Sequence, residues 1–245
     1  MEASKEKIIN KLRSDVLRWE GYKPSSTGKM SSIGLKDLEA VFPDGVFPSG
    51  AIHEFISSNP ENLACTEGFI GGLLHSLMKQ NGISIWISAS RMLFPPSLKL
   101  FGLEPDRLIF VDLKYQKDVL WATEEALKCE GISAVISEMK AINFADSRRL
   151  QLAVEKSRVT GLIVRTDPDR LRATSCVARW RITSLASQLT DDMPGVGFPR
   201  WNVELLKVRN GNPGEWQIEW TANHFSIIKP KPLEAILPKQ KRKTV

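Results

Sequence analysis

Five short and almost uninterrupted apolar runs constrain the fold of this chain more than any other feature of its sequence. A stretch long enough for a crossover connection separates each run from the next. Short, continuously apolar strands of this kind are typical of a parallel sheet that helices cover on both faces. The predicted strands are 51–56, 83–88, 108–111, 132–137 and 161–164.

The stretches between these strands supply the covering layers. Residues 68–79, 118–129 and 145–158 have the composition and apolar spacing of helices, whereas prolines interrupt the weaker helical pattern of residues 91–101. The sequence therefore predicts an α/β fold in which helices flank a mostly parallel sheet.

The pattern changes after residue 169. Residues 176–185, 201–208 and 215–221 alternate apolar and polar side chains, as half-buried strands do. The polar stretch 210–214 provides a turn between the last two of these segments. We expect the C-terminal strands to be antiparallel and to extend one edge of the sheet.

The two ends of the chain differ from this core, which we place at residues 35–228. Residues 1–20 contain an amphipathic helical pattern, and residues 21–34, rich in Ser and Gly, follow as a flexible linker. Residues 229–245 are rich in proline and lysine and are expected to be disordered. Both ends carry apolar side chains suited to docking on a partner, namely Ile8, Leu12, Val16 and Trp19 in the helix and Leu233, Ile236 and Leu237 in the tail.

The positive charge of the chain is concentrated in this tail. The formal net charge is +6, and residues 229–245 account for +5 of it, so residues 1–228 carry only +1. This distribution argues against a core that is itself a broad nucleic-acid-binding surface. The tail cations remain candidate DNA contacts: Lys239, Lys241, Arg242 and Lys243.

The composition indicates a protein of the reducing cytoplasm. The three cysteines are odd in number and widely spaced, which favours free thiols over disulfides or a zinc site. The three histidines also lack the spacing of metal ligands. No secretory signal is visible, and the longest apolar run, 69–78, falls short of the roughly 18 residues that a membrane span needs. We therefore expect no metal, no cofactor and no membrane contact.

The turn between the first strand and the first helix is where a nucleotide-hydrolysing α/β protein carries its phosphate loop. Here that turn, expected at residues 57–66, contains neither glycine nor lysine. Without glycines, side chains crowd the approach of a phosphate, and without the lysine its charge is not neutralised. The place for a phosphate site is present, but its chemistry is missing.

The order of these parts resembles the RecA-like fold and, within it, the ImuA family, RecA/SulA-like proteins that accompany error-prone polymerases in bacteria. The resemblance spans about residues 35–221. Its most specific part is Ala178-Arg179-Trp180-Arg181 together with Arg200-Trp201 and Trp216. The other matching segments are 47–55, 83–87, 148–153 with 161–165, 173–182, and 199–206.

The resemblance implies a degenerate nucleotide site. The phosphate-loop lysine of RecA is missing near Ala64-Cys65, although Thr66 stands where the loop threonine would be. No carboxylate occurs in residues 88–91, where RecA has the glutamate that polarises water. Glu138 stands where the metal-supporting carboxylate would be. Thr66 and Glu138 are thus the candidate cofactor-binding residues of a site that we expect to be non-catalytic.

The two DNA-binding loops of RecA follow its fourth and fifth core strands. In the corresponding connections of this chain, Arg165, Arg170 and Arg172 are the candidate phosphate contacts, with surface salt bridges as the alternative role. Tryptophans in the alternating C-terminal strands are suited to stacking on bases, but such residues also pack half-buried sheets. We favour packing for Trp180, Trp201, Trp216 and Trp220.

The functional hypothesis is a non-catalytic RecA-like accessory protein that supports error-prone translesion DNA synthesis in the bacterial DNA-damage (SOS) response through protein contacts. The resemblance implies an ImuB-type inactive Y-family polymerase, an error-prone polymerase III α-subunit and RecA as partners, with DNA reached directly or through them. The alternatives are an atypical ATPase that uses Thr66 and Glu138, a DNA-binding recombinase-like regulator, and a SulA-like inhibitor of cell division.

Overall fold

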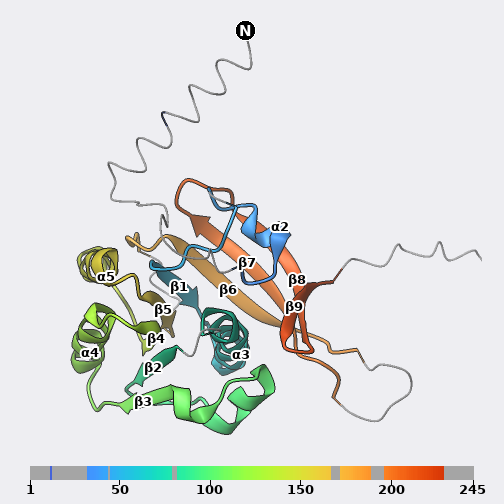
Figure 1. Cartoon of the computed structure of the whole chain (residues 1–245), viewed down its shortest axis with the longest axis horizontal. Helices are drawn as coiled ribbons and strands as arrows, with labels where there is room; N and C mark the ends of the chain where they lie inside the picture. The colour runs from blue at the N-terminus through green and yellow to red at the C-terminus, as the bar shows by residue number, and fades with distance from the viewer. Residues whose placement is uncertain are drawn as a thin grey trace, which may run out of the picture.

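The computed structural model describes residues 12, 32–43, 45–78, 82–166, 172–188 and 196–228. In these residues nine strands form one sheet with the order β3-β2-β4-β5-β1-β6-β7-β8-β9 (Figure 1). Their bounds are β1 Ile52–Ile56, β2 Ile83–Ser88, β3 Leu108–Asp112, β4 Ile132–Met139, β5 Thr160–Arg165, β6 Ala178–Leu185, β7 Arg200–Val208, β8 Gly214–Thr221 and β9 His224–Ile227.

The direction of the strands changes at β6. From β3 to β6, every neighbouring pair in the sheet is parallel, whereas β6, β7, β8 and β9 pair antiparallel. The predicted fold class, a mostly parallel sheet extended by C-terminal antiparallel strands, is confirmed. One detail differs, because β6 pairs in parallel with β1 on one side and antiparallel with β7 on the other.

Helices cover the parallel part of the sheet on both faces (Figure 1). Buried side chains of α3 and η1 join one apolar cluster with β6, β7 and β8, and those of α4 and α5 join a second cluster on the opposite face. The described helices are α2 Lys36–Glu39, α3 Pro60–Leu77, α4 Gln116–Lys128 and α5 Phe144–Ser157, and the 3-10 turns are η1 Pro95–Phe101 and η2 Pro105–Arg107.

Helix α3 begins eight residues earlier than the sequence pattern predicts. Asn59 is its N-cap, and Pro60 occupies the first helical turn. Proline fits there because its missing N–H would have no partner within the helix. The expected ten-residue loop at 57–66 was therefore wrong, since only residues 57–59 separate β1 from α3.

Strand β9 was not predicted. It follows β8 through the two-residue turn Ala222-Asn223, and both residues have positive φ, at 49° and 60°. These dihedrals match the twist of a tight hairpin, but glycine is the usual signal for them and neither residue is glycine. A four-residue strand behind an unmarked turn gives the sequence pattern little to reveal.

Aromatic side chains fill the space between α3 and the C-terminal strands. Trp180, Trp201 and Trp220 are at most 3% exposed, which confirms the packing role favoured for them, while Trp216 is half-buried. Glycines in α3 make room for these rings, since a Cβ added at Gly72 would lie 2.4 Å from the Phe225 ring. The helix thereby packs directly on the aromatic face of the sheet.

Most of the predicted terminal segments lie outside the described residues. Of the amphipathic helix, only Leu12 is described, in a helical conformation and 58% exposed. Ile8, Val16, Trp19, Leu233, Ile236 and Leu237 are not among the described residues. None of the described helices combines the length and the apolar character that crossing a bilayer requires.

Candidate functional site

A pocket of about 280 Å³ lies where β1, β2, β4 and β5 end at their carboxyl termini. The helices that follow β1 and β4 leave toward opposite faces of the sheet. In open α/β sheets, ligands bind at such points beyond the carboxyl ends of the strands. This pocket is therefore the candidate nucleotide site, and its polar lining includes Ser58, Asn59, Ser90, Gln116, Glu138 and Lys140.

The first turn of α3 borders this pocket, but it offers few amide groups to an anion. The Asn59 side chain accepts the N–H of Asn62 at 2.8 Å, and the Asn59 carbonyl accepts the N–H of Leu63 at 3.0 Å. Pro60 has no N–H, so within this turn the Glu61 amide remains, beside its own carboxylate. The groups that would bind a phosphate at a helix N-terminus are thus engaged, absent or next to negative charge.

Thr66 does not face the pocket. Its side chain is fully buried, and its hydroxyl lies 3.0 Å from the hydroxyl of Ser57 at the end of β1. This contact fastens the body of α3 to the strand that precedes it. The position does not fit the nucleotide contact predicted for Thr66, because the early start of α3 places this residue well inside the helix.

Glu138, the residue before the last in β4, lines the pocket and is 6% exposed. Its carboxylate accepts a hydrogen bond from the indole N–H of Trp86. Burial raises the pKa of Glu138, although the Trp86 hydrogen bond and the charge of Arg91 act in the opposite direction. The carboxyl group of Glu138 thus lies between the sheet and α3 and borders the pocket.

A second buried carboxyl group, Glu67 of α3, lies close enough to Glu138 to feel its charge. Burial raises the pKa of Glu67 to about 8, with a further contribution from Glu138. Glu67 is therefore predominantly protonated at neutral pH. Glu67 does not line the pocket itself, and among the described residues that do, Glu138 is the acid and Lys140 is the cation.

With this geometry established, the chain can be compared with known proteins. No protein-family model matches it. Over 200 aligned residues it is 32% identical to Protein ImuA from two strains of Caulobacter vibrioides, and the alignment covers 77% of this chain and 82% of each relative. The chain belongs to the ImuA family. The resemblance to the ImuA family is thereby confirmed.

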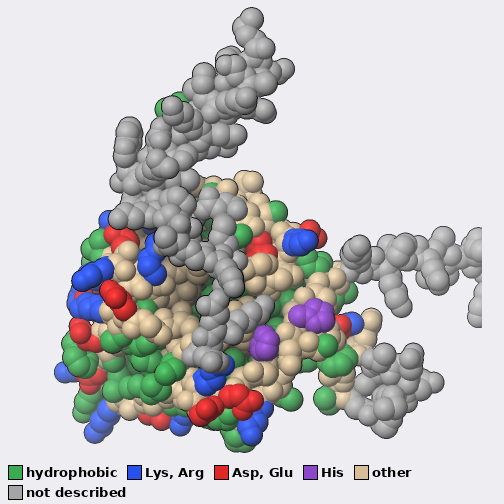
Figure 2. All heavy atoms as spheres, in the orientation of Figure 1, with side chains coloured by type: hydrophobic (Ala, Val, Ile, Leu, Met, Phe, Trp, Pro, Cys, Tyr) green, Lys and Arg blue, Asp and Glu red, His purple; other side chains and the backbone are tan. Residues whose placement is uncertain are grey.

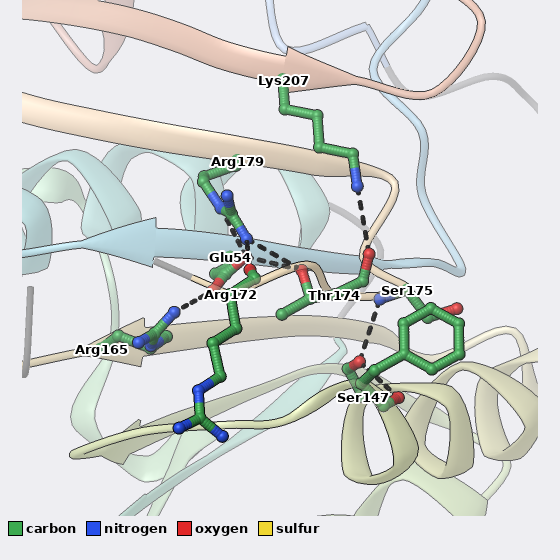
Figure 3. Close-up of polar contacts among 9 residues, drawn as sticks. Glu54, Ser147, Arg165, Arg172, Thr174, Ser175, Arg179 and Lys207 are labelled. Atoms are coloured by element: carbon green, nitrogen blue, oxygen red, sulfur yellow. Dashed lines mark hydrogen bonds and ion pairs between the residues drawn. The ribbon is translucent and has the colours of Figure 1, made fainter. Parts of the chain in front are cut away.

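Beside the pocket, this ImuA-family chain contains a buried ionic network that the sequence did not reveal (Figure 3). Glu54, in the middle of β1 and fully buried, accepts hydrogen bonds at 2.8 Å from Arg165, Arg179 and Thr174. These partners come from β5, β6 and the segment before β6. A single carboxylate thus ties three neighbouring parts of the sheet together.

Arg165 is 1% exposed and forms an ion pair with Glu54, so it does not fit the surface phosphate contact predicted for it. The salt-bridge alternative describes its placement, although the pair is buried rather than superficial. Arg172 is exposed, as a phosphate contact requires. Arg170 and the tail cations Lys239, Lys241, Arg242 and Lys243 lie outside the described residues.

Basic side chains hold the segment 172–175 in this ImuA-family protein through its carbonyl groups. Arg179 donates to the carbonyl of Arg172 at 2.7 Å, Lys207 to that of Thr174 at 3.1 Å, and Arg209 to that of Ser175 at 2.8 Å. Ser147, in the first turn of α5, accepts the N–H of Ser175 at 2.9 Å. The segment is therefore fixed on a surface rich in positive charge.

His53 is a structural residue, as expected for a histidine without metal-ligand spacing. Its Nε2 donates to the carbonyl of Pro48 at 2.8 Å, and its Nδ1 accepts the indole N–H of Trp180 at 3.3 Å. Burial lowers the pKa of His53 to about 4. The neutral ring thus links β1 to β6 on the face opposite Glu54.

The residues missed from the sequence share one recognisable signal. Glu54 is a charged residue at the centre of an apolar strand, and a glutamate is almost never fully buried unless it is paired. That position alone indicates a buried cation nearby. Arg179 alternates with the apolar residues of β6, so its register identifies the partner only once β6 is known to lie beside β1.

Proposed function

We propose that this chain is a non-catalytic accessory protein that supports error-prone translesion DNA synthesis through protein contacts. Membership of the ImuA family supports a role in the ImuA/ImuB mutagenesis system. The proposed partners are an ImuB-type inactive Y-family polymerase, an error-prone polymerase III α-subunit and RecA. In this proposal a RecA-like core is retained for its surfaces, and its phosphate loop is degenerate.

The N-terminus of α3 carries the non-catalytic part of the proposal. A phosphate loop works because free backbone amides and a lysine surround the β- and γ-phosphates. Here Asn59 caps the helix, Pro60 supplies no amide, and Glu61 adds negative charge to the first turn.

An ATP titration with and without Mg²⁺ tests this part of the proposal. We expect no saturable binding at micromolar ATP and no hydrolysis above the buffer. Glu138→Ala and Lys140→Ala should leave both results unchanged, because neither residue has a nucleotide to hold. Micromolar binding, together with turnover that Glu138→Ala abolishes, would establish the atypical ATPase instead.

Complex formation tests the other part. The full chain should co-purify with an ImuB-type polymerase from the same organism, and a Lys140→Ala variant should do so equally well. Damage-induced mutagenesis in cells should depend on the chain but not on Lys140 or Glu138. Loss of mutagenesis in both pocket variants, with the complex intact, would contradict a purely structural role for the pocket.

The surface around residues 172–175 favours DNA binding as a second candidate function. Arg172, Lys207 and Arg209 have no carboxylate partner within the described part of the chain. Nucleic-acid binding at this surface would weaken steeply with salt, and Lys207→Glu would lower both the affinity and the salt dependence. If Lys207→Glu leaves the DNA affinity unchanged, the surface around residues 172–175 does not bind DNA. If deletion of residues 229–245 leaves it unchanged, the tail does not bind DNA.

A further inference from the structure

A groove of about 590 Å³ lies next to the candidate nucleotide site, between α3, residues 92–101 and the two ends of the connection from β6 to β7. Met92 lines both the groove and the nucleotide-site pocket. Most of the other side chains that line the groove are apolar. Two buried ones form its floor, Phe101 and Trp201, and three exposed ones stand at its rim, Phe94, Val196 and Phe198. Exposed apolar side chains around a concave surface are typical of a binding site.

One polar group in this groove lacks a partner. Glu67 lines the groove and is 5% exposed, and among the described residues its Oε1 atom has no hydrogen-bond partner. Nearly all buried polar groups in folded proteins have one. The cation that lines the groove, Arg200, pairs with Glu219 instead. The unpartnered oxygen beside a groove therefore points to a ligand that supplies the missing donor.

A basic group is the donor that suits Glu67 best. Burial raises the pKa of Glu67 to about 8, so its carboxyl group is protonated at neutral pH. A positive charge within about 4–6 Å would favour the ionised form and add a charge-assisted hydrogen bond. The groove therefore suits a polypeptide segment that carries apolar side chains next to a lysine or an arginine.

The C-terminal tail of this chain has this combination. Leu233, Ile236 and Leu237 have the spacing that places side chains on one face of a helical turn, and Lys239 follows two residues later. We propose that the groove is a peptide-binding site and that its occupant is the segment 233–239 of the same chain. The three apolar side chains cover the aromatic floor, and Lys239 pairs with Glu67. A segment that is disordered when free can order on binding in this way.

The tail begins close enough to reach the groove. Ile227 of β9 lies opposite Ile218 of β8, and Ile218 lies opposite Trp201 on the groove floor. Ile227 and Trp201 are thus two strand spacings apart, about 10 Å, and both belong to the same apolar cluster on one face of the sheet. Because β9 points away from the groove, the tail has to turn back. The eight residues from Ile228 to Ile236 span up to about 27 Å, which leaves length for this turn.

The tail is better placed than the N-terminal segment, which is also apolar on one face. The described chain starts at residue 32, and its first part lies near the far end of β7, where the Val41 carbonyl accepts the N–H of Asn212. The groove lies at the other end of β7, beside Arg200. In Figure 2, Lys, Arg, Asp and Glu side chains crowd the surface over α4 and α5, whereas few lie over β8 and β9. An apolar tail that leaves β9 therefore meets few charges on its way.

The short connection makes even weak binding sufficient. A flexible linker of this length gives an effective concentration on the order of 1 mM. A segment that binds in trans with a Kd of about 0.1 mM would therefore occupy the groove about nine-tenths of the time when it is part of the chain. The docked segment covers Cys65, a half-buried thiol that lines the groove, and protects it about tenfold.

The rate at which Cys65 reacts with a maleimide, measured by mass spectrometry on the full chain, tests this occupancy. Ile236→Asp/Leu237→Asp should raise the rate at Cys65 about tenfold, because buried charges without partners prevent docking. Val245→Asp is the matched control, since it changes an apolar tail residue outside 233–239. Cys129, exposed directly after α4, should keep its rate in all three proteins. An unchanged rate at Cys65, or an equal increase at Cys129, would overturn the proposal.

Disulfide formation tests where the segment docks. In a Cys129→Ser background, Ile236→Cys should form an intramolecular disulfide with Cys65 on mild oxidation by diamide, because docking brings the two Cβ atoms within the roughly 3.5–4.5 Å that the bond requires. Val245→Cys in the same background should form far less of it. A disulfide that links two chains through positions 65 and 236 would show that the groove takes the tail of a second copy, and would refute docking within one chain.

A change of charge tests the contact with Glu67. Lys239→Glu should lower the yield of the disulfide between positions 65 and 236 several-fold, because it sets a second acid beside Glu67. Lys243→Glu makes the same change beyond the segment and should leave the yield unchanged. Equal yields in these two variants would refute the pairing of Lys239 with Glu67.

Discussion

Replacing Glu54 with glutamine removes the negative charge that Arg165 and Arg179 share, while the size of the side chain is preserved. Arg165 is 1% exposed, so its guanidinium would stay buried without the carboxylate that balances it. Breaking a buried pair in this way costs about 3–5 kcal/mol of unfolding free energy. For a domain of this size, each kcal/mol lowers Tm by about 2–4 °C, so we expect a decrease of about 6–20 °C.

Urea unfolding followed by tryptophan fluorescence measures this cost directly. The matched control is Glu204→Gln, which breaks the pair with Arg181, whose side chains are 27% and 35% exposed. Such a partly exposed pair contributes at most about 1 kcal/mol. The double variant Glu54→Gln/Arg165→Met should regain part of the lost stability, because it removes the unbalanced charge. Equal unfolding midpoints for Glu54→Gln and Glu204→Gln would refute the assignment of Glu54 as the centre of the network.

Three further predictions concern α3 and β1. Because burial raises the pKa of Glu67 from 4.5 to about 8, the folded state holds a proton that the unfolded state releases, so stability should fall as pH rises from 4.5 to about 8; Glu67→Gln should remove this part of the pH dependence, and an unchanged profile would contradict it. Asn59→Ala should cost about 0.5–2 kcal/mol in urea unfolding through loss of the helix cap, as should Asn143→Ala at the N-cap of α5; an Asn59→Ala variant of wild-type stability would show that the cap has no effect. His53, whose pKa burial lowers to about 4, should keep a neutral ring with its proton on Nε2 at neutral pH; a ring that titrates near 6.5 by NMR would mean that it is accessible to solvent.

The parallel part of the sheet was predictable from the sequence because each strand is buried on both faces. A strand such as 161–164 has no polar face, so its apolar run is continuous and easily recognised. The C-terminal strands were predictable for the opposite reason. In β6, apolar and polar residues alternate because helices cover one face only, and the buried series Ala178, Trp180 and Ile182 follows the period of two.

Features that depend on contacts between distant segments could not be read in the same way. The start of α3 at Pro60 was missed because the loop was placed by analogy with a phosphate loop rather than by the cap signal Asn59-Pro60. The role of Arg165 depends on Glu54, which is 111 residues away in the chain. Local periodicity indicates which face of a helix or strand is buried. It does not indicate which charged residue from another segment packs against that face.

The position of β1 between β5 and β6 has a consequence for how the chain reaches its folded state. The strand nearest the N-terminus is central in the sheet, and its partners around Glu54 lie 111 to 125 residues further along the chain. During synthesis, β1 therefore emerges long before either of its neighbours. Strands β7, β8 and β9, in contrast, join through short connections and can pair as hairpins as soon as they appear.

Strand β1 is thus made first among the strands but paired on both sides only after residue 181 has been synthesised. Contacts of such long sequence separation slow folding, and an apolar strand left unpaired in the meantime is prone to aggregate. Until Arg165 and Arg179 have been synthesised, the carboxylate of Glu54 places a hydrated charge in the middle of this unpaired strand. Glu54, which links β1 to β5 and β6 in the folded protein, would thus also keep β1 soluble before its neighbouring strands are made.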